Sequence, residues 1–174
     1  MTMTSLPLDQ ADTDPRLLRH ALGRFATGVT VITTQVDGKR QGLTVNSFTA
    51  VSLDPPLVLW SLRLVAPSLD GFRRSGHFVV NVLSSEQSDA SRRFAAPHED
   101  KFEGLSFSPG LGGCPMLDGS LAIFECRTES TIDGGDHVIF IGRVVRAHYR
   151  DGDPLIFAGG RYGTHQPLPV DALT

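Results

Sequence analysis

The sequence predicts a mainly β protein, an antiparallel β-barrel with a few helices packed outside it. Three observations support this prediction: short β-rich runs succeed one another along the chain, glycine-containing turns separate them, and helical periodicity is confined to a few segments. Asp37-Gly38 and Gly134-Gly135 are typical of tight hairpin turns, so neighbouring runs should pair antiparallel. The predicted strands are residues 29–34, 42–52, 57–62, 78–83, 120–131 and 137–149.

One amphipathic helix is predicted at residues 14–27, ahead of the first strand. Leu17 and Phe25 share one face at helical spacing, with further apolar residues beside them. Asp14, followed by a proline, suits an N-cap, and Gly28 is typical of the residue that ends a helix. The start and stop signals therefore agree.

The remaining segments complete a single domain, which is a common arrangement for a chain of 174 residues. Two shorter helices are predicted at residues 68–75 and 85–94. Residues 106–115 are rich in Gly, Pro and Ser and are predicted to form a loop. We expect a domain at 14–165, between a flexible N-terminal tail at 1–13 and a C-terminal tail at 166–174.

Composition and charge narrow the class of protein. The chain is 40% hydrophobic and 20% charged, close to the average of soluble globular domains. Its formal net charge is −3 and its basic residues are scattered, which argues against a nucleic-acid partner. The opening lacks a basic stretch followed by an apolar core, and no run approaches the ~18 apolar residues of a membrane helix. We therefore expect a cytoplasmic protein with no membrane partner.

Cys114 and Cys126 match neither a metal site nor a disulfide framework. Neither belongs to a CxxC pair, and the spacing between them is not that of a zinc site. Because cysteine behaves as a small hydrophobic residue, we expect two buried thiols and no metal site.

Several common active-site motifs are missing. The chain contains no GxxxxGK[ST] phosphate loop, no HExxH motif and no GxSxG elbow. Residues 110–113 begin like a dinucleotide fingerprint, but Pro115 stands where the next glycine is required, and no parallel strand precedes them. A dinucleotide would therefore bind here without a Rossmann domain.

The run 42–52 places hydroxyl and amide side chains among β-forming apolar residues. Alternation puts Thr44 and Asn46 on one face, with Ser47 and Thr49 following them. One interpretation is an ordinary half-exposed strand with its polar face outward. The other is a wall of donors and acceptors for a flat heteroaromatic ring.

A candidate anion site follows the third predicted strand. That strand ends near Ser61 and Arg63, and Ser68 stands at a predicted helix start. Free backbone N–H groups and the helix dipole favour an anion such as phosphate there. Serine is also a common helix cap, so the position alone does not decide between the two roles.

Two further positions near the last strands are candidates for function. His137 stands at the mouth of the last predicted hairpin, where a near-neutral pKa suits proton transfer or binding of a carboxamide, although such histidines are also common surface residues. The stretch GGRYG at 159–163 lets the backbone pass close to a ligand and offers Arg161 and Tyr162. The alternative is a plain glycine-rich turn.

Taken in order, GLTVNSFTAVSLDPPLVLWSL (42–62), DKF (100–102), GDHVIFIGRV (135–144) and GGRYG (159–163) resemble the short-chain flavin reductase family. The resemblance runs from about Leu17 to Gly163. It implies an FMN-binding split β-barrel, six-stranded, antiparallel and of Greek-key type, and a homodimer with the flavin near the subunit interface. It also implies that NADH or NADPH reduces FMN or FAD, and that the reduced flavin supplies a separate flavin-dependent monooxygenase.

The resemblance further implies site residues. His137 would orient the nicotinamide. The residues implied at the isoalloxazine edge are Thr44, Val45, Asn46 and Ser47. Those implied at the ribityl chain and phosphate are Ser61, Leu62, Arg63, Ala66 and Ser68. Those implied beside the nucleotide part are Phe94, Ala95 and Lys101, and Arg161 and Tyr162 would close the site. The match at 65–68 is weaker, which leaves the choice between FMN and FAD open.

Three other functions are compatible with a barrel of this kind. An oxidase of the pyridoxamine-phosphate type would hold FMN permanently and need no nicotinamide, and the motifs at His137 and Arg161-Tyr162 argue against it. A noncatalytic flavin-binding redox sensor would bind flavin without steady NADH oxidation. A purely structural barrel would require every polar strand residue to be solvent-facing.

Overall fold

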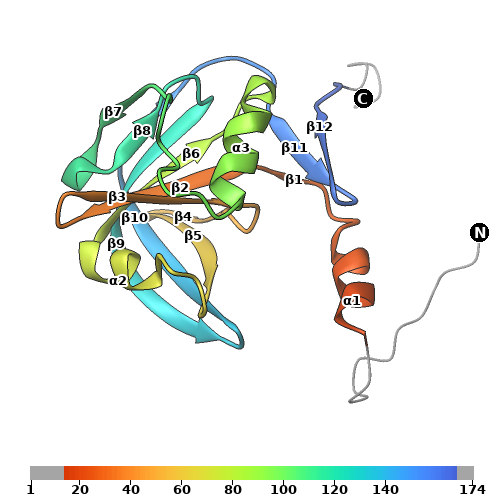
Figure 1. Cartoon of the computed structure of the whole chain (residues 1–174), viewed down its shortest axis with the longest axis horizontal. Helices are drawn as coiled ribbons and strands as arrows, with labels where there is room; N and C mark the ends of the chain where they lie inside the picture. The colour runs from red at the N-terminus through yellow and green to blue at the C-terminus, as the bar shows by residue number, and fades with distance from the viewer. Residues whose placement is uncertain (1–13, 168–174) are drawn as a thin grey trace, which may run out of the picture.

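The computed structural model of the protein describes residues 14–167. The tail predicted at 1–13 and most of the tail predicted at 166–174 lie outside the described residues. Strands dominate this part of the chain and form sheets of seven, three and two strands, with every pairing antiparallel (Figure 1). The mainly β, antiparallel prediction is therefore confirmed.

The seven-stranded sheet forms the barrel and has the order β3-β2-β6-β9-β10-β5-β4. Its strands are β2 (Thr30–Val36), β3 (Lys39–Val45), β4 (Thr49–Leu53), β5 (Pro56–Arg63), β6 (His77–Val82), β9 (Ala122–Gly134) and β10 (His137–Tyr149). Both predicted hairpins are present. Asp37 and Gly38 have positive φ angles of 50° and 74° between β2 and β3, as a tight turn of the hairpin type requires.

The prediction of one strand at residues 42–52 was wrong. The chain leaves the sheet at residues 46–48, so this run becomes the end of β3 and the whole of β4. These two strands lie at opposite edges of the seven-stranded sheet. The physical reason is pairing: β3 bonds to β2, whereas β4 forms a separate hairpin with β5. The six predicted strands therefore correspond to the seven strands of this sheet.

Two small sheets were missed. β1 (Thr27–Gly28), β11 (Leu155–Ala158) and β12 (Arg161–Thr164) form one, and β7 (Phe107–Pro109) with β8 (Pro115–Leu117) forms the other. The predicted loop at 106–115 therefore contains β7 and a 3-10 turn, η2 (Leu111–Gly113). Strands of two to four residues are too short to show an alternating pattern in the sequence, and they form because they pair with neighbouring strands.

Helix α1 (Pro15–Leu22) begins as predicted and ends earlier. The Asp14 side chain accepts a hydrogen bond from the backbone N–H of Arg16 at 2.9 Å, as an N-cap does. The helix stops at Gly23 instead of Gly28, because Thr27 and Gly28 pair with β11. The helix stands away from the barrel, and it buries none of its side chains in the described chain (Figure 1).

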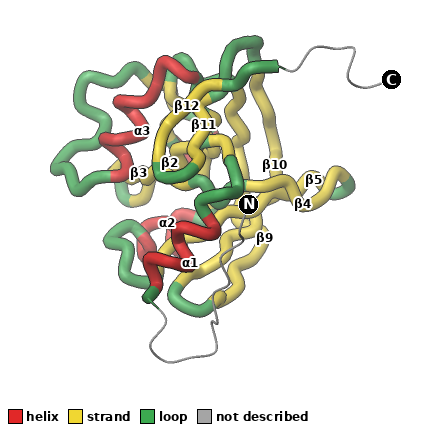
Figure 2. Tube along the Cα trace, turned by 90° about the vertical axis from the view of Figure 1, so that its right-hand side faces the viewer, coloured by secondary structure: helices red, strands yellow, loops and turns green. Residues whose placement is uncertain are grey.

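The other two helices lie close to their predicted positions. α2 (Leu69–Ser75) follows Ser68, and α3 (Ser88–Ala95) follows a 3-10 turn, η1 (Ser85–Gln87). α2 packs mainly on β2 and α3 mainly on β3, and both views show α3 beside that strand (Figure 2). The two helices thus lie near the sheet edge formed by β3.

Apolar side chains form two cores. Inside the barrel, Trp60 stacks on Phe140 with ring centroids 4.7 Å apart and meets Phe72 edge-on at 4.9 Å. Under α3 and the small sheets, a second core contains Phe94 and Phe102, whose ring centroids are 5.0 Å apart. The second core anchors α3 to the outside of the barrel.

Both cysteines are buried free thiols, as predicted. Burial raises the pKa of the Cys126 thiol to about 12, so it stays protonated and unreactive near neutral pH. Within residues 14–167, no helix combines the length and the apolar character that crossing a membrane requires.

Candidate active site

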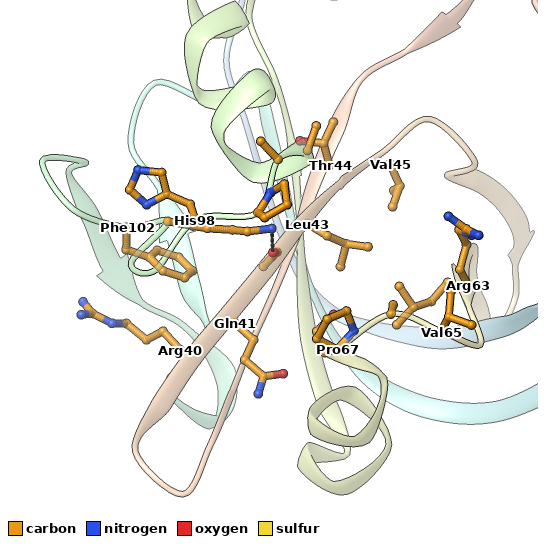
Figure 3. A pocket seen from close by; sticks show the side chains of 18 of the residues that line it. Arg40, Gln41, Leu43, Thr44, Val45, Arg63, Val65, Pro67, His98 and Phe102 are labelled. Atoms are coloured by element: carbon orange, nitrogen blue, oxygen red, sulfur yellow. Dashed lines mark hydrogen bonds between the residues drawn. The ribbon is translucent and has the colours of Figure 1, made fainter.

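A cavity of about 870 Å³ lies at the corner where the chain crosses from β3 toward β4. Its walls are residues 40–47, 61–63, 65–68 and 95–102, together with His137. Figure 3 shows Arg40, His98 and Phe102 on one side of it and Arg63, Val65 and Pro67 on the other. The cavity therefore extends on both sides of β3, one of the two edge strands of the sheet.

Most of the residues implied by the sequence line this cavity. They come from β3, the corner after it, the end of β5, the start of β10 and the two loops that precede α2 and follow α3. The residues concerned are Thr44, Val45, Asn46, Ser47, Ser61, Leu62, Arg63, Ala66, Ser68, Ala95, Lys101 and His137. Their roles toward a ligand stay predictions.

Three implied residues, Phe94, Arg161 and Tyr162, do not line the cavity. Phe94 is fully buried beneath the wall, in the core under α3. Arg161 and Tyr162 belong to β12, and the Tyr162 hydroxyl lies 2.7 Å from Ser91 Oγ in α3. Tyr162 therefore touches the back of the helix that supports the cavity rather than the cavity itself.

Thr44 and Ser47 use their hydroxyl groups to hold the wall together. Thr44 Oγ1 donates to the carbonyl of Ser91 at 2.6 Å, so its only proton is directed at α3. Ser47 Oγ accepts from the backbone N–H of Ser61 at 3.0 Å and ties the corner to β5. Thr44 can still offer a ligand its remaining lone pair, whereas Ser47 also keeps its O–H donor, whose described acceptor is the Ser61 carbonyl at 3.5 Å.

The walls fit a flat heteroaromatic ring with a polar edge. Apolar side chains from several segments supply flat surface: Leu43, Val45, Leu62, Val65, Ala66 and Pro67. The side chains of Asn46 and Arg63 hydrogen-bond to no residue between 14 and 167, so their donors and the Asn46 acceptor are available. A flavin requires this combination of apolar faces and an edge of hydrogen-bonding groups.

His137 is oriented by the residue before it. Its Nδ1 lies 2.7 Å from Asp136 Oδ1, and this hydrogen bond holds the pKa of the Asp136 carboxyl below its ordinary value. An ionised carboxylate only accepts hydrogen bonds, so Nδ1 carries the proton. In the neutral imidazole, Nε2 is then the acceptor. The side chain of His137 is 38% exposed and lines the cavity.

Lys101 closes the end of α3. Its Nζ donates to the carbonyl of Phe94 at 2.9 Å and to that of Gly42 at 3.4 Å. A cation on a free carbonyl in the last turn of a helix stabilises that terminus. Burial lowers the pKa of the Lys101 ammonium from its ordinary value. One of its three N–H groups is left over for a ligand.

Sequence reasoning missed part of the wall: Arg40, Gln41, Gly42, Leu43, Val65, Pro67, Ala96, Pro97, His98, Glu99, Asp100 and Phe102. The missed residues on β3 were predictable, because the turn at Asp37-Gly38 places the start of that strand at Lys39 and not at residue 42. Asp100 and Phe102 belong to the DKF motif, which pointed to this segment, whereas residues 96–99 carried no such signal, because the packing of α3 brings them to the site.

Residues 22–166 match the family described as "flavin reductase like domain". The chain is a member of the flavin reductase family. The family predicted from the four sequence motifs is therefore confirmed.

This flavin reductase family member is similar to proteins of known description. It is 47% identical over 148 residues to FMN reductase (NADH) SmoA of Agrobacterium fabrum, covering 85% of this chain and 84% of that protein. It is 44% identical over 155 residues to HsaB, a flavin-dependent monooxygenase reductase subunit of Rhodococcus jostii, covering 88% and 80%.

A solved structure shares the architecture. Streptomyces globisporus SgcE6, described as an NADH:FAD oxidoreductase in complex with NAD and FAD fragments, superposes with a TM-score of 0.84. The sequences are 37% identical, and the match covers 91% of this chain and 95% of that one. The split-barrel fold of flavin reductases is thereby confirmed for this chain.

Proposed function

We propose that this protein is an NAD(P)H:flavin oxidoreductase that reduces FMN or FAD and delivers the reduced flavin to a separate monooxygenase. The observation that carries the proposal is the cavity at the β3–β4 corner, with apolar walls and unpaired polar groups at one end, in a member of the flavin reductase family. A bound flavin accepts, at N5, a hydride from C4 of the reduced nicotinamide, and the two rings must stack about 3–3.5 Å apart.

The residues of the corner would hold the flavin ring. Asn46 and the backbone of residues 44–47 would meet its polar edge, because the Asn46 side chain has no other described partner. Ser61 and Leu62, with Arg63, Ala66 and Ser68, would follow the ribityl chain toward its phosphate. Arg63 would supply a permanent positive charge near that anion.

His137 would position the nicotinamide. With Nδ1 donating to Asp136, Nε2 presents an acceptor to the cavity, which suits the N–H of a carboxamide. His137 of β10 pairs with Arg63 of β5, so it lies beside the residues that would hold the flavin. A contact of this kind aligns the two rings.

The experiment that tests the function is absorbance of the flavin and NAD(P)H bands, measured anaerobically after mixing with catalytic amounts of protein. FMN and FAD are each compared against NADH and NADPH. Turnover of many equivalents of flavin per protein supports a reductase and identifies both substrates. Binding of flavin without its reduction would contradict the proposal and favour a sensor or an oxidase.

His137→Ala tests the proposed nicotinamide contact. Loss of one hydrogen bond should raise the KM for NADH about two- to tenfold, while the Kd for flavin stays unchanged. His165→Ala, an exposed histidine outside the cavity, is the matched control and should leave both constants unaltered. Unchanged NADH kinetics in His137→Ala would remove His137 from the site.

The proposed delivery to a monooxygenase requires the flavin to leave after reduction. The cavity faces solvent over several exposed residues, including Asn46 and Ser47, which is compatible with exchange. Purified protein should therefore lose flavin on dialysis and regain activity with added flavin. Flavin that stays bound through many turnovers would contradict this part of the proposal.

We also propose a homodimer in which α1 takes part in the contact. Leu22, at the end of α1, and Phe25, in the bend that follows it, are 65% and 78% exposed, and α1 stands away from the barrel. Apolar surface of this kind is typical of an interface. Analytical ultracentrifugation should give twice the chain mass, and Leu22→Asp with Phe25→Asp should shift the protein toward monomer. A monomeric parent protein would overturn the proposal.

A cytoplasmic location is proposed with the activity. Both cysteines are free thiols in the described chain, as is usual in a reducing compartment. Reduced nicotinamide dinucleotide, the proposed electron donor, is available there.

A further inference from the structure

The corner of residues 46–48 carries part of the proposed flavin site, although it belongs to no strand. Asn46 and Ser47 are exposed and line the cavity, whereas Phe48 is half-buried and does not line it. The sheet fixes only the two ends of the corner, where β3 pairs with β2 and β4 pairs with β5. The direction of the Asn46 side chain therefore depends on what holds the corner between these two ends.

Two side-chain contacts attach the corner to the barrel. Ser47 Oγ accepts from the backbone N–H of Ser61 at 3.0 Å, which ties the corner to β5. The Phe48 ring stacks on the ring of Phe124 in β9, with centroids 5.7 Å apart and an interplanar angle of 26°. Because β9 is the middle strand of the seven-stranded sheet, this second contact joins the corner to the interior of the sheet rather than to its edge.

Phe124 is well supported from both sides. Its backbone pairs with Val80 of β6 on one side and with Ala147 of β10 on the other. Phe48 and Phe124 both pack against the core inside the barrel, which contains Trp60. Aromatic rings at this separation attract each other beyond their apolar burial. The Phe48 ring therefore fixes the corner relative to the barrel core.

Asn46 is the cavity residue that depends most on this contact. Its amide group hydrogen-bonds to no residue between 14 and 167, so no side-chain partner fixes its direction. The attachment at Ser47 alone would leave the short corner free to rotate about that contact, and the attachment at Phe48 removes this freedom. A polar group that is ordered before the ligand arrives lowers the entropic cost of binding.

We propose that Phe48 is a positioning residue for the flavin: by stacking on Phe124, it holds the Asn46 side chain toward the polar edge of the flavin ring. This rests on the proposed function, which places that edge at residues 44–47. Since Phe48 lies outside the lining of the cavity, its effect on the flavin passes through Asn46.

The first test is flavin binding, measured by fluorescence titration of FMN in the absence of NADH. Phe48→Ala should raise the Kd for FMN about tenfold, because it removes one aromatic contact. Phe48→Tyr keeps the ring and should bind FMN like the parent protein. Ile123→Ala is the matched control and should leave the Kd unchanged, because Ile123 is half-buried on the same strand as Phe124 and alternation points it to the opposite face.

The second test separates positioning from a general loss of structure. In an Asn46→Ala background the group that Phe48 positions is gone, so adding Phe48→Ala should raise the Kd for FMN by less than about twofold. The single variant Phe48→Ala should also leave the KM for NADH and the kcat at saturating flavin nearly unchanged, because the proposed nicotinamide contact is at His137. A destabilised fold would instead raise both substrate constants in either background.

Three results would overturn the proposal. They are an unchanged Kd for FMN in Phe48→Ala, an effect that persists undiminished in the Asn46→Ala background, and an equal rise in the KM for NADH. If Phe48→Ala does not fold, Phe48→Leu takes its place, because leucine keeps the apolar burial without the ring, and the same three measurements decide.

This proposal and the proposed function can fail separately. Binding of FMN is measured without turnover, so it reports on the corner even where no flavin is reduced. Reduction of FMN by the parent protein supports the proposed function whatever the effect of Phe48→Ala.

Discussion

Gly42 of β3 lies directly against the ring of Phe94 from α3. A Cβ there would lie 2.7 Å from Cε1 of Phe94 and 3.3 Å from the carbonyl oxygen of Ile32. Phe94 is fully buried and packed on Phe102, so its ring cannot move aside without opening the core. The missing side chain at 42 therefore allows the cavity wall to seal.

Gly42→Ala should destabilise the fold by about 1–3 kcal/mol, the usual cost of forcing a methyl group into a packed core. Urea denaturation measures the change. Gly28→Ala is the control, because a Cβ at Gly28 meets nothing within 4 Å and its φ angle is not positive. Equal stability of the two variants would show that the Phe94 ring adapts.

Residue types at the site were predictable, but their directions were not. The polar character of Thr44 and Ser47 is evident in the sequence, and both line the cavity. The hydroxyl of Thr44 turns to the carbonyl of Ser91, which is 47 positions away in the chain. No local pattern reports such a partner, so the direction of this hydroxyl was not predictable from the sequence.

At the scale of elements, α3 is held from both sides. Thr44 of β3 donates to the Ser91 carbonyl at 2.6 Å, and Tyr162 of β12 lies 2.7 Å from the Ser91 side-chain oxygen. Arg92 also lies over the Tyr162 ring, with Cζ 5.5 Å from its centroid. The small sheet therefore supports the cavity wall through one buried serine, and we expect Tyr162 to act as a positioning residue.

Tyr162→Phe should remove this support while keeping the ring. We expect a loss of about 0.5–1.5 kcal/mol in stability, since one buried hydrogen bond disappears and the Ser91 hydroxyl loses its partner. Flavin binding should weaken while kcat changes little, a split that a remote structural effect would not produce. Tyr149→Phe, at an 88% exposed tyrosine, is the control. Unaltered flavin affinity in Tyr162→Phe would contradict the positioning role.

The elements fixed by local contacts were predicted well. The hairpin between β2 and β3 and the positions of α2 and α3 follow from turn residues and spacing within each segment. The separation of β3 from β4 depends instead on pairings between distant strands, such as β6 with β9 and β10 with β5. The pairing of strands far apart in the chain cannot be predicted from the sequence of one short segment.

At the scale of the molecule, a buried carboxylate ties the β9–β10 hairpin to the loop before β8. Glu125 is 1% exposed, and its oxygens accept from Arg146 at 3.0 Å, His148 at 2.9 Å and the backbone N–H of Leu111 at 2.6 Å. Burial alone would raise the pKa of Glu125, but these hydrogen bonds and charges outweigh it and hold the pKa below its ordinary value of 4.5.

The folded state should therefore lose stability in acid. Because the pKa of Glu125 is lower in the folded chain, the ionised group stabilises the fold above about pH 4.5, and this contribution is lost as the pH falls through the folded-state pKa. Glu125→Gln should be less stable at pH 7, by several kcal/mol, and should show a shallower acid dependence in urea midpoints. Glu86→Gln, at an exposed carboxyl with no salt bridge to a residue between 14 and 167, should behave like the parent protein. An unchanged acid slope in Glu125→Gln would exclude Glu125 as the group responsible.

The crossing of residues 46–48 from one sheet edge to the other has a consequence for how a ligand acts on the fold. The cavity corner exists only when every strand between β3 and β4 is in register, because these strands are the two ends of the sheet. A ligand in the cavity therefore selects the fully closed sheet and gains no affinity from any partly opened form. By linkage, binding should slow amide hydrogen exchange in β6 and β9, the strands between the two sheet edges, as well as in β3.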